Sequence, residues 1–150
     1  MSESNKLIAH RLLDALWNQQ NFGLVDALLA SDYDGHSSTE FDGPEGAKAF
    51  VPMLRSAFPD FQFTVEDQIA EGDKVVTRWS MSGTHKGEFQ GMSATGRQMS
   101  ITGITIFRIA SDKVIEGWTN EDLLGFYQQI GNIPSPEQAG RSEQNENVSR

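Results

Sequence analysis

Two histidines and a glutamate are the residues in this sequence whose types suit acid–base chemistry. His36 lies in a polar stretch that contains glycine, His85 follows an alternating run, and Glu116 lies two residues before Trp118. Histidine titrates near neutral pH, and a glutamate that is buried without partners has a raised pKa, so each suits a general acid or base. We therefore predict His85, Glu116 and His36 as candidate catalytic residues.

Each candidate also has a simpler interpretation. His36 and His85 lie in loop-like segments, where a histidine is often simply solvated, and Glu116 fits equally well on an exposed sheet face. Arg78 lies in mid-strand and is suited either to an ion pair with Glu116 or to orienting a ligand through its guanidinium group. The sequence alone leaves these alternatives open.

Large apolar and polar side chains both alternate along the predicted strands, which favours a pocket over a plain core. Glu116 and Trp118 share one face of their strand because strand side chains repeat every two residues, but that face is not assigned to either side of the sheet. We predict that a ligand is contacted by Tyr33, Arg78, Trp79, Trp118 and Asn120.

Composition narrows the classes of partner and cofactor. The formal charge of −9 comes without a cluster of lysines and arginines, so nucleic acid and anionic membranes are poor partners. The chain has no cysteine, no closely spaced His/His/carboxylate group and no dinucleotide or phosphate-binding fingerprint. We expect neither a metal nor a cofactor. The N-terminus lacks a signal-peptide pattern, which predicts a cytoplasmic protein.

The elements that must position these residues follow from hydrophobic periodicity. Three- and four-residue spacing predicts helices at 3–20, 24–29, 44–58 and 121–130, and Pro52 is expected to kink or divide the third of these. Alternation predicts four antiparallel strands at 61–69, 75–82, 99–109 and 114–120, whereas the polar stretch 30–38 is expected to be a turn. The class is α+β, with helices packed on one face of a curved sheet.

The 150 residues suffice for one domain with a sizeable core. We place that domain at 1–133. Residues 134–150 are almost entirely polar, cannot bury enough apolar surface to offset their ordering entropy, and are expected to form a disordered tail.

A set of short motifs, in their order and spacing, resembles the SnoaL-like polyketide cyclases, often called ester cyclases. The motifs are Gly43-Pro-Glu-Gly46, Phe58-Pro-Asp60, Gly72 to Arg78, Gly83-Thr-His-Lys-Gly87, Gly91 to Arg97, Ile115-Glu-Gly-Trp118, Asp122 and Gln129-Ile-Gly131. The resemblance spans about residues 5 to 133. It implies a cone-shaped fold of the nuclear-transport-factor-like superfamily, in which a curved antiparallel sheet and N-terminal helices enclose one apolar cavity.

The resemblance also implies a hydrophobic small-molecule ligand, a homodimer through the sheet, and ring closure by intramolecular aldol condensation without cofactor or metal. In the cyclases, and in the similar limonene-type epoxide hydrolases, an aspartate just after the tryptophan position transfers the proton. Here Thr119 and Asn120 follow Trp118. The hydrolases also pair an arginine with an aspartate two residues later, whereas Ser80 lies two residues after Arg78, which disfavours that activity.

Two functions remain from the sequence. The first is a cofactor-independent cyclase or isomerase that uses another acid–base group. The second is a non-catalytic protein that binds small molecules in the same fold.

Overall fold

The computed structural model describes residues 2–37, 43–131 and 133–134. Apart from Pro134, the predicted polar tail lies outside the described residues. The elements in chain order are α1 (Ser2–Asp14), a π-helix η1 (Ala15–Gln19), α2 (Phe22–Leu28), β1 (Leu29–His36), α3 (Gly43–Ala57), β2 (Gln62–Glu71), β3 (Lys74–Thr84), β4 (Gln98–Ala110), β5 (Lys113–Glu121) and α4 (Leu123–Ile130).

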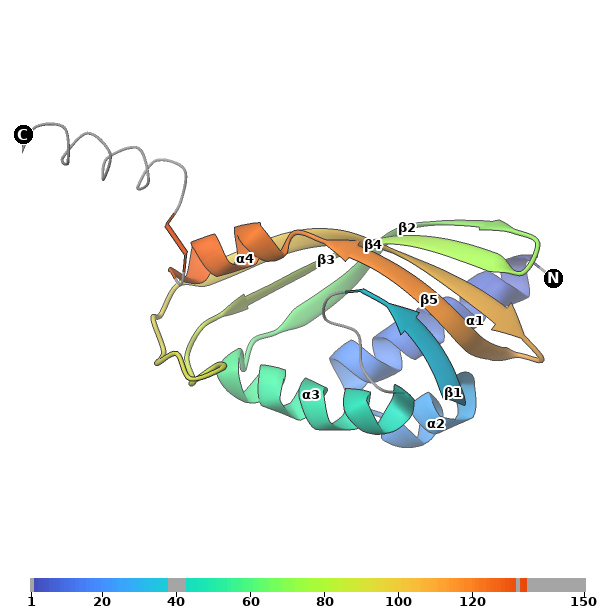
Figure 1. The fold of residues 1–150 in the computed structure, drawn as a ribbon, viewed down its shortest axis with the longest axis horizontal. Helices are drawn as coiled ribbons and strands as arrows, with labels where there is room; N and C mark the ends of the chain where they lie inside the picture. The colour runs from blue at the N-terminus through green and yellow to red at the C-terminus, as the bar shows by residue number, and fades with distance from the viewer. Residues whose placement is uncertain (1, 38–42, 132, 135–150) are drawn as a thin grey trace, which may run out of the picture.

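The sheet has five strands in the order β1-β5-β4-β3-β2 (Figure 1). Strands β2 to β5 pair in antiparallel fashion, as predicted. Strand β1 pairs with β5 in parallel, so the prediction of a turn was wrong for 30–36, while residue 38 of the predicted turn lies outside the described residues. This edge strand has one neighbour, and Asp32, Asp34 and His36 on it are exposed, so its sequence lacks the apolar content by which strands are recognised.

The helices α1, α2 and α3 lie on one face of the sheet, so the predicted α+β class is confirmed (Figure 1). Pro52 lies inside α3 but does not divide it. Its side chain is exposed, so the carbonyl group that loses its helical donor can be solvated. The first predicted helix is also continuous, but its last turn is the π-helix η1, which places Trp17 under the sheet beside Phe63.

The side chain of Asn18 ties η1 to the sheet. Its amide group donates to the Phe63 carbonyl over 2.8 Å and its oxygen accepts from the Phe63 N–H over 2.9 Å. Arg55 of α3 donates to the Asn18 carbonyl over 2.7 Å. These bonds hold α3, η1 and β2 at fixed distances and leave a space between the helices and the sheet. No helix in the described part of the chain is long and apolar enough to cross a bilayer.

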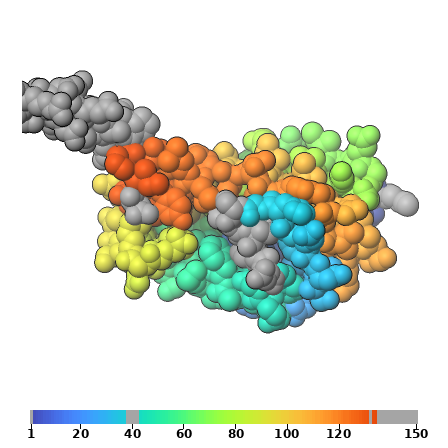
Figure 2. Space-filling model, viewed as in Figure 1, coloured from blue at the N-terminus to red at the C-terminus, as the bar shows by residue number. Residues whose placement is uncertain are grey.

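The connection between β3 and β4 lies against both α3 and α4, as the yellow atoms show in the space-filling view (Figure 2). Backbone N–H groups of Lys86 and Gly87 donate to the Ala57 carbonyl at the end of α3. Tyr127 of α4 donates from its hydroxyl to the Gln90 side chain over 2.8 Å. This connection therefore closes one end of the space under the sheet.

Candidate functional site

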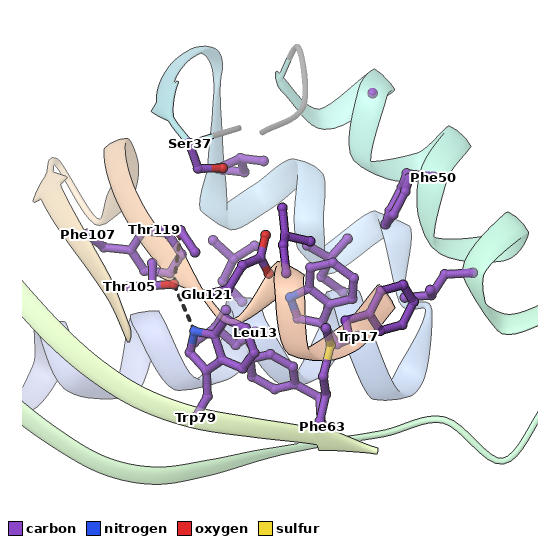
Figure 3. Close-up of a pocket in the computed structure, with 18 of the residues that line it drawn as sticks. Leu13, Trp17, Ser37, Phe50, Phe63, Trp79, Thr105, Phe107, Thr119 and Glu121 are labelled. Carbon is purple, nitrogen blue, oxygen red and sulfur yellow. Dashed lines mark hydrogen bonds between the residues drawn. The ribbon is translucent and has the colours of Figure 1, made fainter. Parts of the chain in front are cut away.

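A pocket of about 440 Å³ lies between the helices and the concave face of the sheet (Figure 3). Its wall is mostly apolar and aromatic, and every helix and strand except α2 contributes to it. The lining residues are Leu12, Leu13, Leu16, Trp17, Leu29, Tyr33, Ser37, Gly46, Phe50, Leu54, Phe63, Trp79, Met81, Phe89, Gln90, Thr105, Phe107, Thr119, Glu121, Leu123, Phe126 and Tyr127. Its size and composition are typical of a site for a small apolar molecule with a few polar groups.

Packed aromatic rings fix one wall of the pocket. The rings of Trp17 and Phe63 stack with centroids 5.7 Å apart, and Phe63 lies 5.1 Å from Trp79. Phe50 meets Trp17 edge-to-face at 6.4 Å. Rings held in this way keep their positions without a ligand, so the wall is ready to accept a flat, apolar molecule.

Glu121 is the single acidic side chain in the described lining, and no lysine, arginine or histidine accompanies it there. It faces the pocket because Gly117, Thr119 and Glu121 occupy alternate positions of β5, whose concave side meets the helices. Figure 3 shows Glu121 among the side chains that surround the pocket. This carboxylate can exchange a proton with a bound molecule, which no apolar neighbour can do.

A short chain of hydrogen bonds runs along the sheet wall beside Glu121. Trp79 donates from its indole Nε1 to Thr105 Oγ1 over 2.9 Å, and Thr105 Oγ1 lies 2.9 Å from Thr119 Oγ1. Gly103 makes this possible, because a Cβ at that position would overlap the Trp79 ring. The absence of a side chain at Gly103 lets the indole lie flat across β4 and reach Thr105.

A second glycine opens the wall for Tyr33. A Cβ on Gly117 would overlap the Tyr33 hydroxyl and press against the Phe107 ring. The parallel strand β1 therefore brings the Tyr33 hydroxyl close to the backbone of β5, next to the row of Thr105 and Thr119. Tyr33 and Trp79 are the predicted ligand contacts that line the pocket, and their contact with a ligand stays a prediction.

The other predicted contacts lie on the opposite, convex face of the sheet. In the pairing register Arg78 is opposite Ile104, which is opposite Asn120, and this row alternates with the rows that line the pocket. Trp118 lies opposite Ile106, in the next row on the same convex face. None of Arg78, Trp118 and Asn120 is in the described lining.

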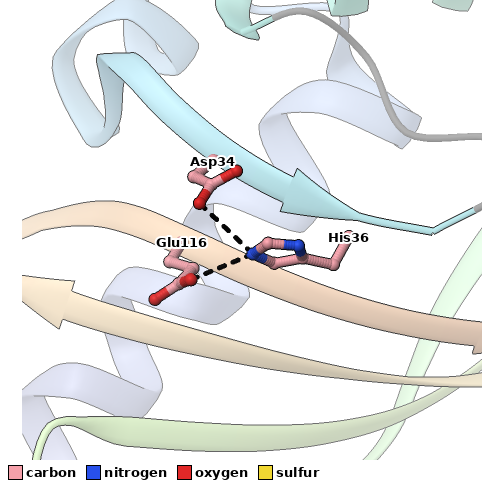
Figure 4. Close-up of side chains that lie close together, drawn as sticks. All are labelled: Asp34, His36 and Glu116. Atoms are coloured by element: carbon pink, nitrogen blue, oxygen red, sulfur yellow. Dashed lines mark hydrogen bonds and ion pairs between the residues drawn. The ribbon is translucent and has the colours of Figure 1, made fainter.

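His36 and Glu116, both predicted as catalytic, also lie on the convex face and contact each other (Figure 4). His36 Nε2 is 2.9 Å from Glu116 Oε2 and 3.3 Å from Asp34 Oδ2, and the imidazole stacks on Trp118 at 5.4 Å. Arg108 forms an ion pair with Glu116 in place of the predicted partner Arg78. Neither His36 nor Glu116 lines the pocket, and their catalytic role stays a prediction.

The electrostatics of this cluster differ from the raised pKa considered for a buried Glu116. The hydrogen bond from His36, together with Arg108, holds the pKa of Glu116 below its usual range. The same hydrogen bond, helped by Asp34, raises the pKa of His36 above its ordinary value of 6.5. The contact therefore favours the protonated imidazole of His36 and the ionised carboxylate of Glu116, as expected of an ion pair that joins two strands.

Asp34, His36 and Glu116 are also the group in the described chain that comes nearest to a metal site, with ligand atoms within 4.8 Å of one another. One imidazole and two carboxylates suit a divalent transition metal. However, Arg108 already engages Glu116, and His36 Nε2 is shared between both carboxylates. The contacts within the group explain its arrangement without an ion.

His85 is completely buried at the start of the β3–β4 connection, outside the described pocket lining. Its ring stacks on Phe58 at 5.3 Å, and its Nδ1 accepts from the Thr95 N–H over 3.3 Å and lies 3.0 Å from Thr95 Oγ1. These contacts join the connection to the end of α3. The predicted catalytic role of His85 stays a prediction, and the structure gives the residue a packing role.

Glu121, Thr105 and Thr119 were not predicted from the sequence as a group in one pocket. A signal was present, because Thr119 and Glu121 repeat at two-residue spacing with Gly117, opposite in phase to Glu116 and Trp118. The sequence does not show which of these two alternating sets faces the helices. Tryptophans do not decide this, because they occur on both faces of the sheet.

Comparisons with known proteins agree with this architecture. The family model described as "SnoaL-like polyketide cyclase" matches residues 7–130. The chain is 36% identical to aklanonic acid methyl ester cyclase DnrD of Streptomyces peucetius over 100 residues, which span 65% of this chain and 69% of that protein.

Solved structures show the same fold. TsrD of Streptomyces laurentii superposes with a TM-score of 0.78 at 30% identity, over 89% of this chain and 98% of that one. A SnoaL-like cyclase from Jannaschia sp. CCS1, described as putative, superposes with a TM-score of 0.75 at 28% identity, over 89% of this chain and 95% of that one. The resemblance seen in the sequence motifs is confirmed, and the chain belongs to the SnoaL-like polyketide cyclase family.

Proposed function

We propose that this protein closes a ring in a neutral, apolar polyketide by an intramolecular aldol condensation, with Glu121 as its acid–base group and without a cofactor. The observation that carries the proposal is the position of Glu121, a single carboxylate in the described lining of an apolar, aromatic pocket. A carboxylate in such a setting is a common general base for protons next to a carbonyl group.

The reaction needs one proton to leave and one to return. The Glu121 carboxylate removes a proton from the carbon beside a carbonyl group, and the electrons of that C–H bond form an enolate. The enolate carbon then bonds to a second carbonyl carbon of the same molecule, whose oxygen becomes an alkoxide. The alkoxide takes the proton back from the Glu121 carboxylic acid, so the glutamate is regenerated.

The charge of the pocket favours an uncharged substrate. A carboxylate on the ligand would be repelled by the Glu121 carboxylate. The described lining contains no lysine, arginine or histidine with which the ligand carboxylate could form an ion pair. An ester or ketone carries no such penalty. This agrees with the name of the relative DnrD, an aklanonic acid methyl ester cyclase, and makes that ester a rational first substrate.

The experiment is to incubate the purified protein with aklanonic acid methyl ester and to follow ring closure by chromatography and absorbance. The proposal expects product to form faster than in buffer. Binding of the ester without accelerated ring closure would instead support the non-catalytic function, and absence of both would reject this substrate class.

We also propose that two copies associate through the convex sheet face in the cytoplasm. A row of apolar side chains crosses this face, with Ile69 opposite Val76, Val76 opposite Ile106, and Ile106 opposite Trp118. Ile69 and Ile104 are 63% and 47% exposed in the single chain. Association of two such faces would remove these side chains from water.

A further inference from the structure

The hydrogen bonds from Trp79 to Thr105 and between Thr105 and Thr119 have a direction. An indole N–H is a donor only, so Thr105 Oγ1 is the acceptor in its 2.9 Å contact with Trp79. Thr105 is 4% exposed, and its own hydroxyl hydrogen therefore needs an acceptor inside the protein. Apart from Trp79, its hydrogen-bond partner in the described chain is Thr119 Oγ1, also at 2.9 Å.

The direction of the bond between Thr105 and Thr119 decides whether the Thr119 hydroxyl hydrogen is free to donate to a ligand. If Thr105 donates to Thr119, the Thr119 oxygen accepts, and its hydrogen can be directed to a ligand in the pocket that Thr119 lines. If Thr119 donated instead, the buried Thr105 hydroxyl hydrogen would have no acceptor among these groups, at the cost of an unsatisfied buried donor. The first arrangement is thus the more stable.

Thr119 and Glu121 lie two residues apart on β5 and face the same pocket. Their Cα atoms are therefore about 6 to 7 Å apart along the strand, and their side chains point to the same side. An enolisation needs a base at the carbon and a hydrogen-bond donor at the neighbouring carbonyl oxygen. Glu121 and Thr119 supply these two groups from one wall.

We propose that Thr119 is a catalytic residue that donates a hydrogen bond to the carbonyl oxygen of the substrate as it becomes an enolate, and that Trp79 and Thr105 are positioning residues that fix the direction of this donation. The inference rests on the proposed function, because it names the donor for the same reaction. The inference extends the proposed function by assigning a role to each of Trp79, Thr105 and Thr119.

The first test uses ring closure of aklanonic acid methyl ester by Thr119→Val, with Thr119→Ser as the matched control. Valine has nearly the shape of threonine but no hydroxyl, so we expect kcat to fall at least about 10-fold with a smaller change in KM, since the bond strengthens as charge develops. Serine keeps the hydroxyl and should restore most of kcat. Wild-type kcat in Thr119→Val would overturn the proposal.

The second test does not depend on turnover. A phenol such as 4-nitrophenol, bound in the pocket of the Glu121→Gln variant, presents an oxyanion whose ionisation is visible by absorbance. Donation from Thr119 should lower the pKa of the bound phenol, and adding Thr119→Val or Trp79→Phe should raise it again. An unchanged pKa in both variants would overturn the proposal even if the wild-type protein is a cyclase. If these changes raise the pKa of the bound phenol but the wild-type protein has no cyclase activity, the role of Thr119 as a donor is supported and the proposed reaction is rejected.

Discussion

Glu116 and Glu121 are five positions apart on β5 and have different surroundings. An odd spacing places two side chains on opposite faces of a strand, so Glu121 lines the pocket while Glu116 contacts His36 and Arg108 on the convex face. Partners for the charged form lower the pKa of Glu116 and keep it ionised. Its position outside the described lining and its lowered pKa do not support the predicted role as a general acid, which stays a prediction.

His85 provides a prediction at the same scale. Replacing it with alanine removes the stack on Phe58 and the bonds to Thr95, which should lower the free energy of unfolding by about 2 to 4 kcal/mol. Urea denaturation measures this loss. His10→Ala is the control, since His10 is exposed on α1 and its loss should change little.

The same pair of variants tests whether His85 takes part in catalysis. We expect kcat per folded molecule to be unchanged in His85→Ala, because the imidazole lies outside the described pocket lining. A large fall in kcat with the fold intact would restore the histidine to the active site.

At the scale of elements, a charged contact joins the edge strand β1 to β5 in addition to their parallel pairing. Strand β1 brings Tyr33 to the pocket wall, and its last residue, His36, bonds to Glu116 of β5. The groups that face His36 are Asp34, Glu116 and the Trp118 ring, with Arg108 on the far side of Glu116. Two of these carry negative charge, so protonation of His36 strengthens the attachment of β1.

This contact predicts a pH dependence of stability. The pKa of His36 is raised in the folded state, so its contribution is fully present below the unfolded value near 6.5 and is lost as the pH rises through the raised folded value. The pKa of Glu116 is lowered, so its contribution is present above the unfolded value near 4.5 and is lost as the pH falls through the lowered folded value.

The measurement is the free energy of unfolding of wild type and His36→Gln across this range, with an NMR titration of His36. The advantage of wild type should be greatest in mildly acidic solution, between about pH 4.5 and 6.5, and should decline as the imidazole deprotonates. An advantage that is constant with pH, or a His36 pKa below 6.5, would show that the pair does not hold β1.

At the scale of the whole molecule, the convex face predicts a dimer. We expect light scattering to give twice the chain mass for wild type and the single mass for Ile104→Glu, because a buried glutamate without a partner is strongly unfavourable. Leu7→Glu is matched in exposure, at 52% against 47%, and lies on α1 away from this face, so it should remain a dimer. A monomeric wild type at micromolar concentration would contradict the prediction.

The sequence predicted most of this architecture because alternation and helical periodicity are local properties. The strands β2 to β5 and the third and fourth helices have clear periods, and motifs from Gly43 to Gly131 identify the family. Strand β1 was missed because a polar edge strand has no such period. Its pairing with β5 is set by contacts between residues about 80 positions apart, such as His36 and Glu116.

The site was harder to predict because both sheet faces carry aromatic and polar residues. Trp79 lies in the pocket and Trp118 outside it, so a tryptophan does not identify the inner face. An extra residue in β2, between Val65 and Asp67, and another in β5, between Val114 and Glu116, also shift the alternation along these two strands. Only the packing of the helices decides which set lines the pocket.

The most direct test of the account compares kcat for aklanonic acid methyl ester in Glu121→Gln and Glu116→Gln. Both changes remove one carboxylate from β5 and keep its shape, but only the first alters the pocket. We predict that Glu121→Gln lowers kcat by about 10² to 10⁴-fold. Glu116→Gln should leave kcat per folded molecule unchanged. Equal activity of Glu121→Gln and wild type, or a loss confined to Glu116→Gln, would contradict the assignment of the active site to the concave face.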